Sequence, residues 1–366
     1  MRPVTYCTNI HPGESWTETL ENLEKHALAV KAACLPGAPF PIGLRVSGRA
    51  AHELTSDEAQ RFRDWMEERG LYVATVNGFP YGAFHNRPVK ADVYLPDWRS
   101  RTRLDYTRSL AEFLAIWLPE GMTGSISTVP LGFREAFGPD EAAPAMAMLR
   151  QALEALARLE EDTGRRIQLS VEAEPGCLLE TTPDLVDFFR RMDLPERLAP
   201  YLAACYDCCH QALQFEDPEE SLRLLAQNGV PVGHVQVSSA LRLSACDLGR
   251  LVRFNEPVYL HQAVAATPQG LVRFDDLPEA LAADVPGAAQ WRAHFHLPVF
   301  MDELPECAST NDFLRRILPL FDPDVPMEVE TYTFSVLPKD LQTPTVTESI
   351  IREIAWVEKA RRGENP

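Results

Sequence analysis

Residues 166–172, RIQLSVE, alternate polar and apolar side chains along their whole length. The odd positions carry Ile167, Leu169 and Val171, and the even positions carry Gln168, Ser170 and Glu172. A period of two residues predicts a β-strand. The preceding residues 139–163, rich in Ala, Leu, Glu and Arg, have the pattern of a long helix. A helix followed at once by a strand is a repeating unit of α/β folds.

The same succession of strand and helix runs through the chain. Strands are predicted at residues 3–8, 42–47, 71–77, 123–129, 166–172, 202–207, 232–237 and 326–331. Helices are predicted at residues 15–34, 56–69, 101–117, 139–163, 181–192, 217–228, 246–253 and 344–361. Eight such units predict a (β/α)8 TIM barrel that occupies residues 1–366 as one domain. An open doubly wound sheet is the alternative, disfavoured because no glycine-rich phosphate loop follows any strand.

Two connections are too long for a minimal barrel. Residues 78–100 follow the third strand and are rich in aromatic residues and proline. Residues 254–325 form a long insertion between the seventh and eighth strands and contain further strand-like pieces. Loops that follow barrel strands lie on the face where barrel enzymes hold their sites. We therefore predict that both segments cover the C-terminal face as lids.

Composition and charge narrow the classes of partner. The chain has 45% hydrophobic and 24% charged residues, which is typical of a globular protein. No run approaches the roughly 18 apolar residues of a membrane helix, and the N-terminal residues lack a targeting pattern, so we expect a cytoplasmic protein without membrane insertion. The net charge of −18 would repel nucleic acid. A small molecule or a cation suits this charge better, and oligomerisation is left open.

Oxygen-bearing side chains stand near the ends of the last four predicted strands, at Glu172, Asp207, Gln236 and Glu330. Strand parity turns all four into the barrel, where residues near the carboxyl ends of neighbouring strands meet. Three carboxylates would repel one another there unless a cation lay between them. Oxygen ligands favour Mn²⁺ or Mg²⁺, with Co²⁺ and Zn²⁺ as alternatives. For each residue singly, pairing with a core Arg or Lys is the competing interpretation.

These positions also carry a family resemblance. The motifs VEAEPG, YDCCH, HVQVS and VETY resemble the strand-end motifs of the xylose isomerase-like barrels, the sugar isomerase and epimerase superfamily. Within it, TYCTNIHPGESW, EPGCLLE, YLHQ, HFHLP and ETYTFSVLP are most similar to the EboE group of metabolite traffic proteins. The superfamily resemblance implies one divalent ion held by Glu172, Asp207, Gln236 and Glu330. It also implies that His210 contacts the substrate.

The resemblance has one departure. Gln236 stands where many sugar epimerases have histidine, whereas hydroxypyruvate isomerase-like members have glutamine. An oxygen ligand is retained at this position, and the preference for a particular metal is left open.

The stretch CYDCCH, residues 205–210, admits a second interpretation. Asp207 and His210 are expected to be the functional pair, with Cys205, Cys208 and Cys209 packed as small buried hydrophobic residues. A zinc site made of the three cysteines is the rival. Its weakness is that the adjacent Cys208 and Cys209 cannot easily reach one tetrahedral ion together with Cys205.

Further candidates for metal or substrate contacts lie outside the four strand ends. They are His11 and Trp16 after the first strand, Arg45 on the second strand, Asn77 at the end of the third, and His261, His294 and His296 in the insertion. His294 and His296 share one face of a strand-like piece, so they could fold over the metal, with His261 beside them. For each of these residues a structural role is the alternative: solvated loops, a polar hairpin edge or a turn.

Arg45 is expected to point into the barrel, where a buried guanidinium needs a carboxylate. Glu328 or an anionic substrate could supply it. Asn77 suits a sugar hydroxyl, and a turn before Gly78 would use it equally well.

These features predict a metal-dependent isomerase or epimerase of a sugar or cyclitol. A divalent ion that binds a carbonyl and an adjacent hydroxyl makes the neighbouring C–H acidic, and proton transfer then proceeds through a metal-bound enediolate. Glu172 and Glu330 are expected to act as base and acid, and His210 to orient a hydroxyl. Two alternatives remain: an endonuclease IV-like hydrolase, and a protein of the EboE type that carries a small polyhydroxylated metabolite without turnover.

Overall fold

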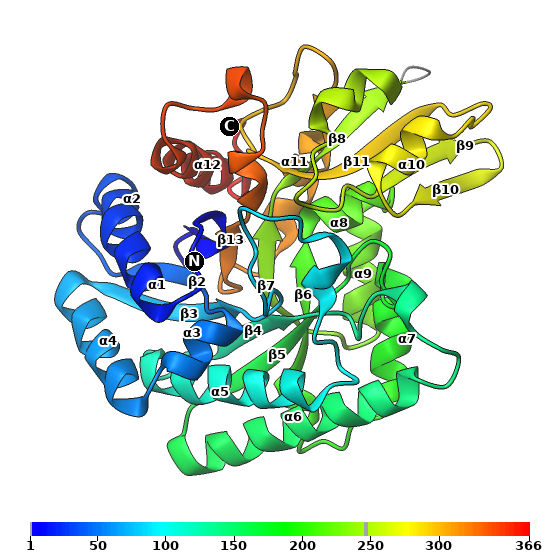
Figure 1. Cartoon of the computed structure of the whole chain (residues 1–366). Coiled ribbons are helices and arrows are strands. Elements are labelled where there is room, and N and C mark those ends of the chain that lie inside the picture. The colour runs from blue at the N-terminus through cyan, green and yellow to red at the C-terminus, as the bar shows by residue number, and fades with distance from the viewer. Residues whose placement is uncertain (1, 245–247) are drawn as a thin grey trace.

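The computed structural model describes residues 2–244 and 248–366. Eight parallel strands form the central sheet, in the order β1-β13-β7-β6-β5-β4-β3-β2 (Figure 1). They are β1 Thr5–Tyr6, β2 Phe40–Arg45, β3 Leu71–Asn77, β4 Gly124–Thr128, β5 Ile167–Glu172, β6 Leu202–Asp207, β7 Val232–Val237 and β13 Met327–Val329. A single parallel bridge between Cys7 and Gly43 joins the two edge strands and closes the ring. The predicted (β/α)8 TIM barrel is therefore confirmed.

The helices surround this barrel (Figure 1). They are α1 Trp16–Asn22, α2 Leu28–Cys34, α3 Gly48–Glu53, α4 Ser56–Arg69, α5 Arg101–Trp117, α6 Ala142–Thr163, α7 Thr182–Met192, α8 Cys208–Leu213, α9 Pro218–Gln227, α11 Asn311–Ile317 and α12 Val346–Ala360, with α10 Leu277–Ala282 in the insertion. Ser15, Thr55 and Thr181 cap their helices with full capping boxes. The predicted helix 15–34 is interrupted by a π-helical turn, Leu23–Ala27.

A second sheet of five antiparallel strands lies between β7 and β13 in the chain. Its order is β10-β9-β11-β8-β12, with β8 Ser239–Ser244, β9 Ala263–Thr267, β10 Gly270–Phe274, β11 Gln290–Leu297 and β12 Ala308–Ser309. This sheet has its own apolar core, which includes Leu251, Trp291 and Phe295. It begins at Ser239, earlier than the predicted start of the insertion at residue 254.

The predicted helix 246–253 differs from the structure. Residues 245–247 lie outside the described residues, and Leu248–Phe254 form 3₁₀ turns. Leu248, Leu251 and Phe254 pack into the core of the second sheet instead of covering the barrel. The segment 78–100 is mostly irregular and contains one 3₁₀ helix, Lys90–Tyr94. Shorter 3₁₀ turns occur at residues 8–10, 134–136, 199–201, 318–320, 332–335 and 339–341.

Strand register explains where the functional side chains converge. Glu172 pairs with Cys205 across β5 and β6, and Gln236 of β7 pairs with Asp207 on one side and Glu328 on the other. Because barrel strands tilt, paired residues are staggered along the barrel axis. The two-residue steps from Cys205 to Asp207 and from Glu328 to Glu330 follow this stagger, so Glu172, Asp207, Gln236 and Glu330 reach one rim.

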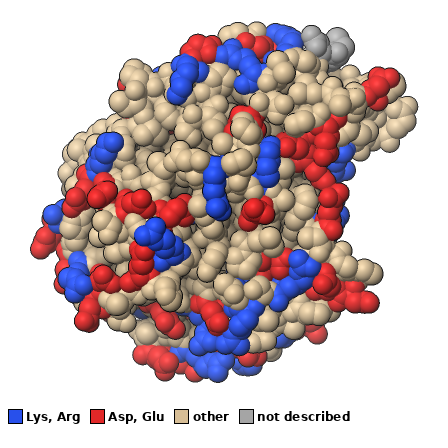
Figure 2. All heavy atoms as spheres, in the orientation of Figure 1, with Lys and Arg blue, Asp and Glu red and all other residues tan. Residues whose placement is uncertain are grey.

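On the face of the molecule shown in Figure 2, acidic and basic side chains are interspersed. Among the described residues, no helix is long and apolar enough to span a bilayer.

Candidate metal centre and pocket

Three carboxylates meet at the C-terminal rim of the barrel. One oxygen from each of Glu172, Asp207 and Glu330 lies within 4.8 Å of the other two. All three side chains are buried. Burial raises the pKa of each carboxyl above its usual range, and for Glu172 and Glu330 the neighbouring acids add to this rise.

Two oxygens of this group have no N–H or hydroxyl donor. Glu172 Oε2 and Asp207 Oδ2 are buried and accept no N–H or hydroxyl, while Asp207 Oδ1 accepts the backbone N–H of His210 at the start of α8. The Asp207 and Glu330 carboxyls lie close enough to share a proton, which lowers the pKa of Asp207 and raises that of Glu330. Within residues 2–244 and 248–366, no Lys or Arg lies within ion-pair distance of Glu172, Asp207 or Glu330. Buried unpaired carboxylate oxygens are costly, so this donor set fits a divalent cation.

Glu330 is held from one side by three amides. Asn9, Asn77 and Gln236 donate to its Oε1 at 2.7, 2.8 and 2.9 Å. This leaves Oε2 on the side of the pocket, 3.6 Å from His296 Nδ1. Asn77, which was predicted to suit a sugar hydroxyl or a turn, thus donates in the structure to the Glu330 carboxylate of the cluster.

Gln236 is arranged differently from its predicted use as a ligand. Its amide nitrogen faces Glu330, and its oxygen accepts a hydrogen bond from the Cys205 thiol at 3.1 Å. Cys205 also lies 3.3 Å from His234 Nε2 inside the barrel. An amide beside a carboxylate turns its donor toward it, which explains the orientation. The oxygen would face the cluster only after rotation of the amide.

His210 lies between the carboxylate cluster and the inserted sheet. Its Nδ1 donates to the carbonyl of Ala173 at 2.9 Å. Its Nε2 is 3.2 Å from Glu174 Oε2 and 3.4 Å from His296 Nε2. Burial lowers the pKa of His210 to about 3, so the ring is neutral at pH 7.

The inserted sheet contributes two histidines from β11. His296 Nδ1 donates to the backbone carbonyl of Glu330 at 2.8 Å, and His294 Nδ1 contacts Gln262 Oε1 at 2.7 Å. Burial lowers the pKa of both rings, to about 4 for His296. His294 and His296 therefore lie on one face of β11, as predicted, and this face points toward the barrel rim.

Glu174 and Tyr94 are among the pocket residues that were not predicted from the sequence. Glu174 lies two positions beyond Glu172, and Tyr94 donates to Glu174 Oε1 at 3.0 Å. Burial raises the pKa of Glu174 well above its usual range. Strand parity could have identified Glu174, because it continues the inward series of β5; no sequence signal distinguishes Tyr94 from other aromatic residues of the 78–100 segment.

These side chains enclose a small pocket of about 50 Å³. The barrel contributes Asn9, Asn77, Glu172, Glu174, His210 and Glu330; the 78–100 segment contributes Phe79, Pro80, Phe84, Val89, Lys90, Val93 and Tyr94; the insertion and the segment after β13 contribute Tyr259, Leu260, Gln262, His294, His296 and Tyr332. Lys90 is the single Lys or Arg in this lining, and its Nζ pairs with Asp276 at 2.6 Å.

Six predicted candidates are not part of this lining: Asp207 and Gln236, whose contacts are given above, and His11, Trp16, Arg45 and His261. His11 contacts Tyr6 and stacks on His26, with ring centroids 4.2 Å apart. Trp16 does not wall the pocket: it packs against Phe62 and Trp117 in the helical layer, because α1 turns its indole toward α4 and α5.

Arg45 and His261 hold loops in place. Arg45 does not pair with Glu328: it pairs with Glu14 at 3.0 Å and donates to the carbonyl of Gly82. Glu328 accepts from Thr75 instead, at 2.8 Å. His261 is bound on both ring nitrogens, to the carbonyl of His294 and to Glu256.

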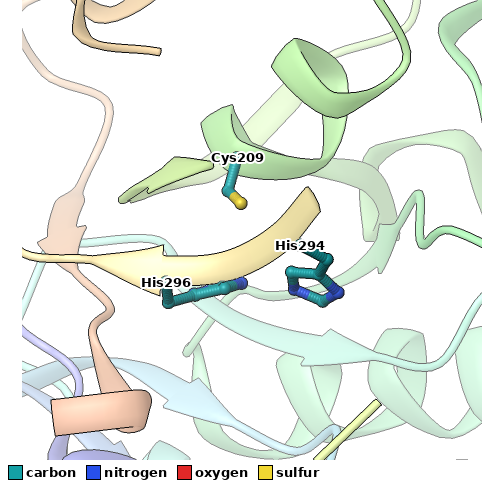
Figure 3. A group of neighbouring side chains, drawn as sticks. All are labelled: Cys209, His294 and His296. Atoms are coloured by element: carbon teal, nitrogen blue, oxygen red, sulfur yellow. The ribbon is translucent and has the colours of Figure 1, made fainter. Parts of the chain in front are cut away.

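The three cysteines of residues 205–209 do not form a zinc site. No group of three cysteines lies within ligand distance in the described part of the chain. A sulfur–nitrogen group of Cys209, His294 and His296 does exist, with atoms within 4.8 Å. Figure 3 shows Cys209 on the α8 side of β11 and the two rings on the other side. The backbone N–H of Phe295 donates a hydrogen bond to the Cys209 sulfur. We therefore interpret this thiol as packed against β11.

Comparison with known proteins is consistent with this architecture. A family model described as Xylose isomerase-like TIM barrel matches residues 40–256. The chain belongs to this family. No curated protein sequence matches the chain. The EboE grouping stays a prediction.

Solved structures share the fold of this xylose isomerase-like barrel at low identity. A xylose isomerase-like TIM barrel protein from Mycobacterium smegmatis in complex with magnesium is 12% identical, covers 99% of this chain and 98% of its own, and has a TM-score of 0.55. D-psicose 3-epimerase from Clostridium cellulolyticum H10 with D-tagatose is 10% identical, with 99% and 98% covered and a TM-score of 0.54. The IOLI protein with a binding zinc atom is 14% identical, with 98% and 96% covered and a TM-score of 0.51.

Proposed function

We propose that the protein is a divalent-metal-dependent isomerase or epimerase of a small polyhydroxylated carbonyl compound, a sugar or a cyclitol. One observation carries this proposal: Glu172 Oε2 and Asp207 Oδ2 are buried without an N–H or hydroxyl donor, and both residues belong to the same carboxylate cluster as Glu330. Solved structures of the same fold include a magnesium complex, a zinc complex and a sugar epimerase, which supports the same class of chemistry.

Glu172, Asp207 and Glu330 would hold the ion, and Gln236 would join them if its amide rotates. When bound, a divalent ion withdraws electron density from a carbonyl and an adjacent hydroxyl and so makes the neighbouring C–H more acidic. An all-oxygen ligand set favours Mn²⁺ or Mg²⁺.

The chain's own carboxyls would move the protons. Glu172 and Glu330 come from β5 and from the end of β13, which are three strands apart in the ring. One carboxylate removes the proton from the carbon beside the carbonyl, and the other carboxyl returns a proton to the opposite face of that carbon. The three amides on Glu330 Oε1 fix this side chain, so its Oε2 can exchange a proton without moving.

The pocket lining favours an uncharged substrate. Lys90 is already paired with Asp276, and the remaining polar atoms of the lining are mostly acceptors. Hydroxyl groups are donors that such a lining can bind, whereas a phosphate would face carboxylates. We assign His210 to orient a substrate oxygen at the end of the pocket nearest the inserted sheet.

Deuterium exchange tests this function. The metal-loaded protein is incubated in D₂O with D-tagatose and other ketoses and cyclitol ketones, and NMR follows exchange of the C–H beside the carbonyl. We expect exchange with at least one compound, loss of exchange after chelation, and a fall of at least about 100-fold in Glu172→Gln and Glu330→Gln. His52→Asn, at an exposed position, is the matched control.

Three outcomes would contradict the proposal. Exchange that persists after chelation would exclude the role of the metal. Ligand binding without exchange, unchanged by chelation, would indicate a carrier instead. Hydrolysis of phosphodiesters by the loaded protein would indicate the endonuclease IV-like alternative.

A further inference from the structure

His85 lies in the 78–100 segment beside the pocket, and both of its ring nitrogens are hydrogen-bonded. Its Nε2 lies 2.6 Å from the backbone carbonyl of Asn9, and its Nδ1 lies 2.8 Å from the hydroxyl of Tyr259. A carbonyl can only accept, so Nε2 carries the proton and donates to Asn9. Burial lowers the pKa of His85 to about 4, so the ring is neutral at pH 7 and its Nδ1 accepts from Tyr259.

Asn9 connects this histidine to the carboxylate cluster. Its backbone carbonyl accepts from His85, and its side-chain amide donates to Glu330 Oε1 at 2.7 Å. The other side-chain atom, Asn9 Oδ1, is buried and has no hydrogen-bond donor in the described part of the chain. Because no second bond fixes the side chain through its oxygen, the direction of the Asn9 amide depends on where its backbone lies.

The other two amides on Glu330 Oε1 stand on barrel strands. Asn77 ends β3, and its backbone pairs with β2 and β4. Gln236 lies within β7 and pairs with β6 and β13. Asn9 instead lies in the 3₁₀ turn that follows β1. The N–H of His85, and not a strand ladder, holds its carbonyl.

His85 itself stays outside the space that a ligand would occupy. It is not part of the pocket lining, whereas its neighbour Phe84 and its partner Tyr259 are. The rings of Phe84, Tyr259 and Tyr332 pack on one another, with centroids 5.0–5.3 Å apart. This packing fixes Tyr259, whose hydroxyl donates to His85. An effect of His85 on the site must therefore pass through the residues it bonds.

We propose that His85 is a positioning residue for Glu330. Held by Tyr259 of the insertion, His85 fixes the carbonyl of Asn9, and the Asn9 amide then holds Glu330 Oε1. Glu330 Oε2 remains on the side of the pocket. The segments that cover the rim thereby set the direction of a carboxylate on the barrel.

The role of His85 rests on the proposed function in its last step alone, where Glu330 Oε2 would meet the ion and transfer a proton. The bond from His85 to Asn9, and its effect on the Asn9 amide, are independent of metal and of turnover. The positioning role and the proposed function can therefore be tested separately.

The first test is NMR of the whole chain without added metal, labelled with ¹⁵N in asparagine side chains. Asn9→Ser assigns the signal of the Asn9 amide. In His85→Leu we expect this amide to exchange its protons with solvent at least about fivefold faster than in wild type, because the bond that holds its carbonyl is lost. His85→Gln can still donate to the carbonyl and should stay within about twofold of wild type. His52→Asn, at an exposed position, is the matched control.

The second test is a double-mutant cycle of Mn²⁺ affinity. His85→Leu should weaken Mn²⁺ binding by about fivefold, and Asn9→Ala by at least as much. Because His85 acts through Asn9, adding His85→Leu to Asn9→Ala should change the affinity by less than about twofold. If His85→Leu does not fold, Tyr259→Phe replaces it in both tests, since this variant keeps the ring and removes only the hydroxyl that holds His85.

Two results would overturn the positioning role. One is exchange of the Asn9 amide in His85→Leu, or in Tyr259→Phe, that is as slow as in wild type. The other is an equal loss of Mn²⁺ affinity with and without Asn9→Ala, which would show a structural effect that bypasses Asn9. Wild-type protein that binds no Mn²⁺ would instead contradict the proposed function, and the NMR test would still decide the role of His85.

Discussion

At the scale of single residues, Gly43 shapes the barrel interior beneath the site because it has no side chain. A Cβ added to Gly43 would lie 1.8 Å from Glu328 Oε2 and 2.9 Å from the carbonyl of Tyr6. That same Glu328 oxygen accepts from Thr75. Only glycine leaves room for Glu328 at this point of the ring closure.

We therefore expect Gly43→Ala to lower the free energy of unfolding by about 1–3 kcal/mol, since a crowded core must shift to accept the methyl group. Urea denaturation of the variant measures this. Gly37→Ala, where no atom lies within 4 Å of the added Cβ, should stay within about 0.5 kcal/mol of wild type. Equal effects of the two substitutions would show that the contact with Glu328 does not matter.

Glu353 is a buried acid away from the pocket. Its Oε1 accepts from Ser349 and Thr331, and the backbone N–H of Val299 also faces the carboxyl and lowers its pKa. Burial raises its pKa to about 8. Because the folded chain binds this proton more tightly than the unfolded chain, the contribution of Glu353 to stability is full below pH 4.5 and is lost as the pH rises to about 8.

The variant Glu353→Gln keeps the Oε1 acceptor and cannot ionise. Its stability relative to wild type should therefore increase between pH 5 and pH 8, with an upper limit of about 5 kcal/mol. Urea midpoints across this range give the measurement. A difference between the two proteins that does not change with pH would contradict the assignment.

The sequence predicts strand-end residues well and loop residues poorly. Glu172, Asp207 and Glu330 follow from strand parity, and His294 and His296 from their shared face of a strand. No such geometric rule applied to Trp16, whose indole turns into the helical layer, or to Arg45, whose partner Glu14 lies in an irregular loop. The orientation of the Gln236 amide depends on Cys205, a contact across strands that a sequence does not show.

At the scale of elements, the inserted sheet and the 78–100 segment meet at Asp276. Its Oδ2 pairs with Lys90 at 2.6 Å, and its Oδ1 accepts the backbone N–H groups of His261 and Leu277, both at 3.0 Å. One side chain thus joins the 78–100 segment, the segment before β9 and the start of α10.

Asp276→Ala should destabilise this junction by about 2 kcal/mol, because charged acceptor bonds to two backbone donors are lost. Hydrogen exchange of residues 258–262 should become faster. Asp276→Asn keeps an oxygen for those donors and loses only a partly exposed ion pair, so its cost should stay below about 1 kcal/mol. Exchange in Asp276→Ala as slow as in wild type would contradict the role of this junction.

Elements of the barrel were more predictable than those of the insertion. Each predicted barrel strand is present because its apolar alternation is bounded by a helix. By contrast, β8 follows β7 after one residue, Ser238, and no turn signal separates the two strands. The spacing of Leu248, Leu251 and Phe254 would also fit a helix that covers the barrel. Packing of these three side chains into the core of the second sheet determines where the segment lies.

At the scale of the molecule, the barrel gathers acids that are far apart in the chain, and the inserted sheet adds neutral histidines above them. Burial raises the pKa of Glu172 and Glu330 and lowers that of His210 and His296. The closed barrel was predicted from the eight strand–helix units of the sequence. The cover over the rim depends on contacts between segments more than 150 residues apart, such as that of Lys90 with Asp276.

The most direct measurement is an anomalous difference map from metal-stripped crystals soaked in Mn²⁺, collected for wild type and for Glu330→Gln. We expect a wild-type peak within about 2.0–2.6 Å of an oxygen from each of Glu172, Asp207 and Glu330, absent from the variant. Three acids whose pKa values are all raised, two of them with an oxygen that accepts no N–H or hydroxyl, would then have their counterion. A wild-type map without density at that point, at millimolar Mn²⁺ and neutral pH, would contradict the account.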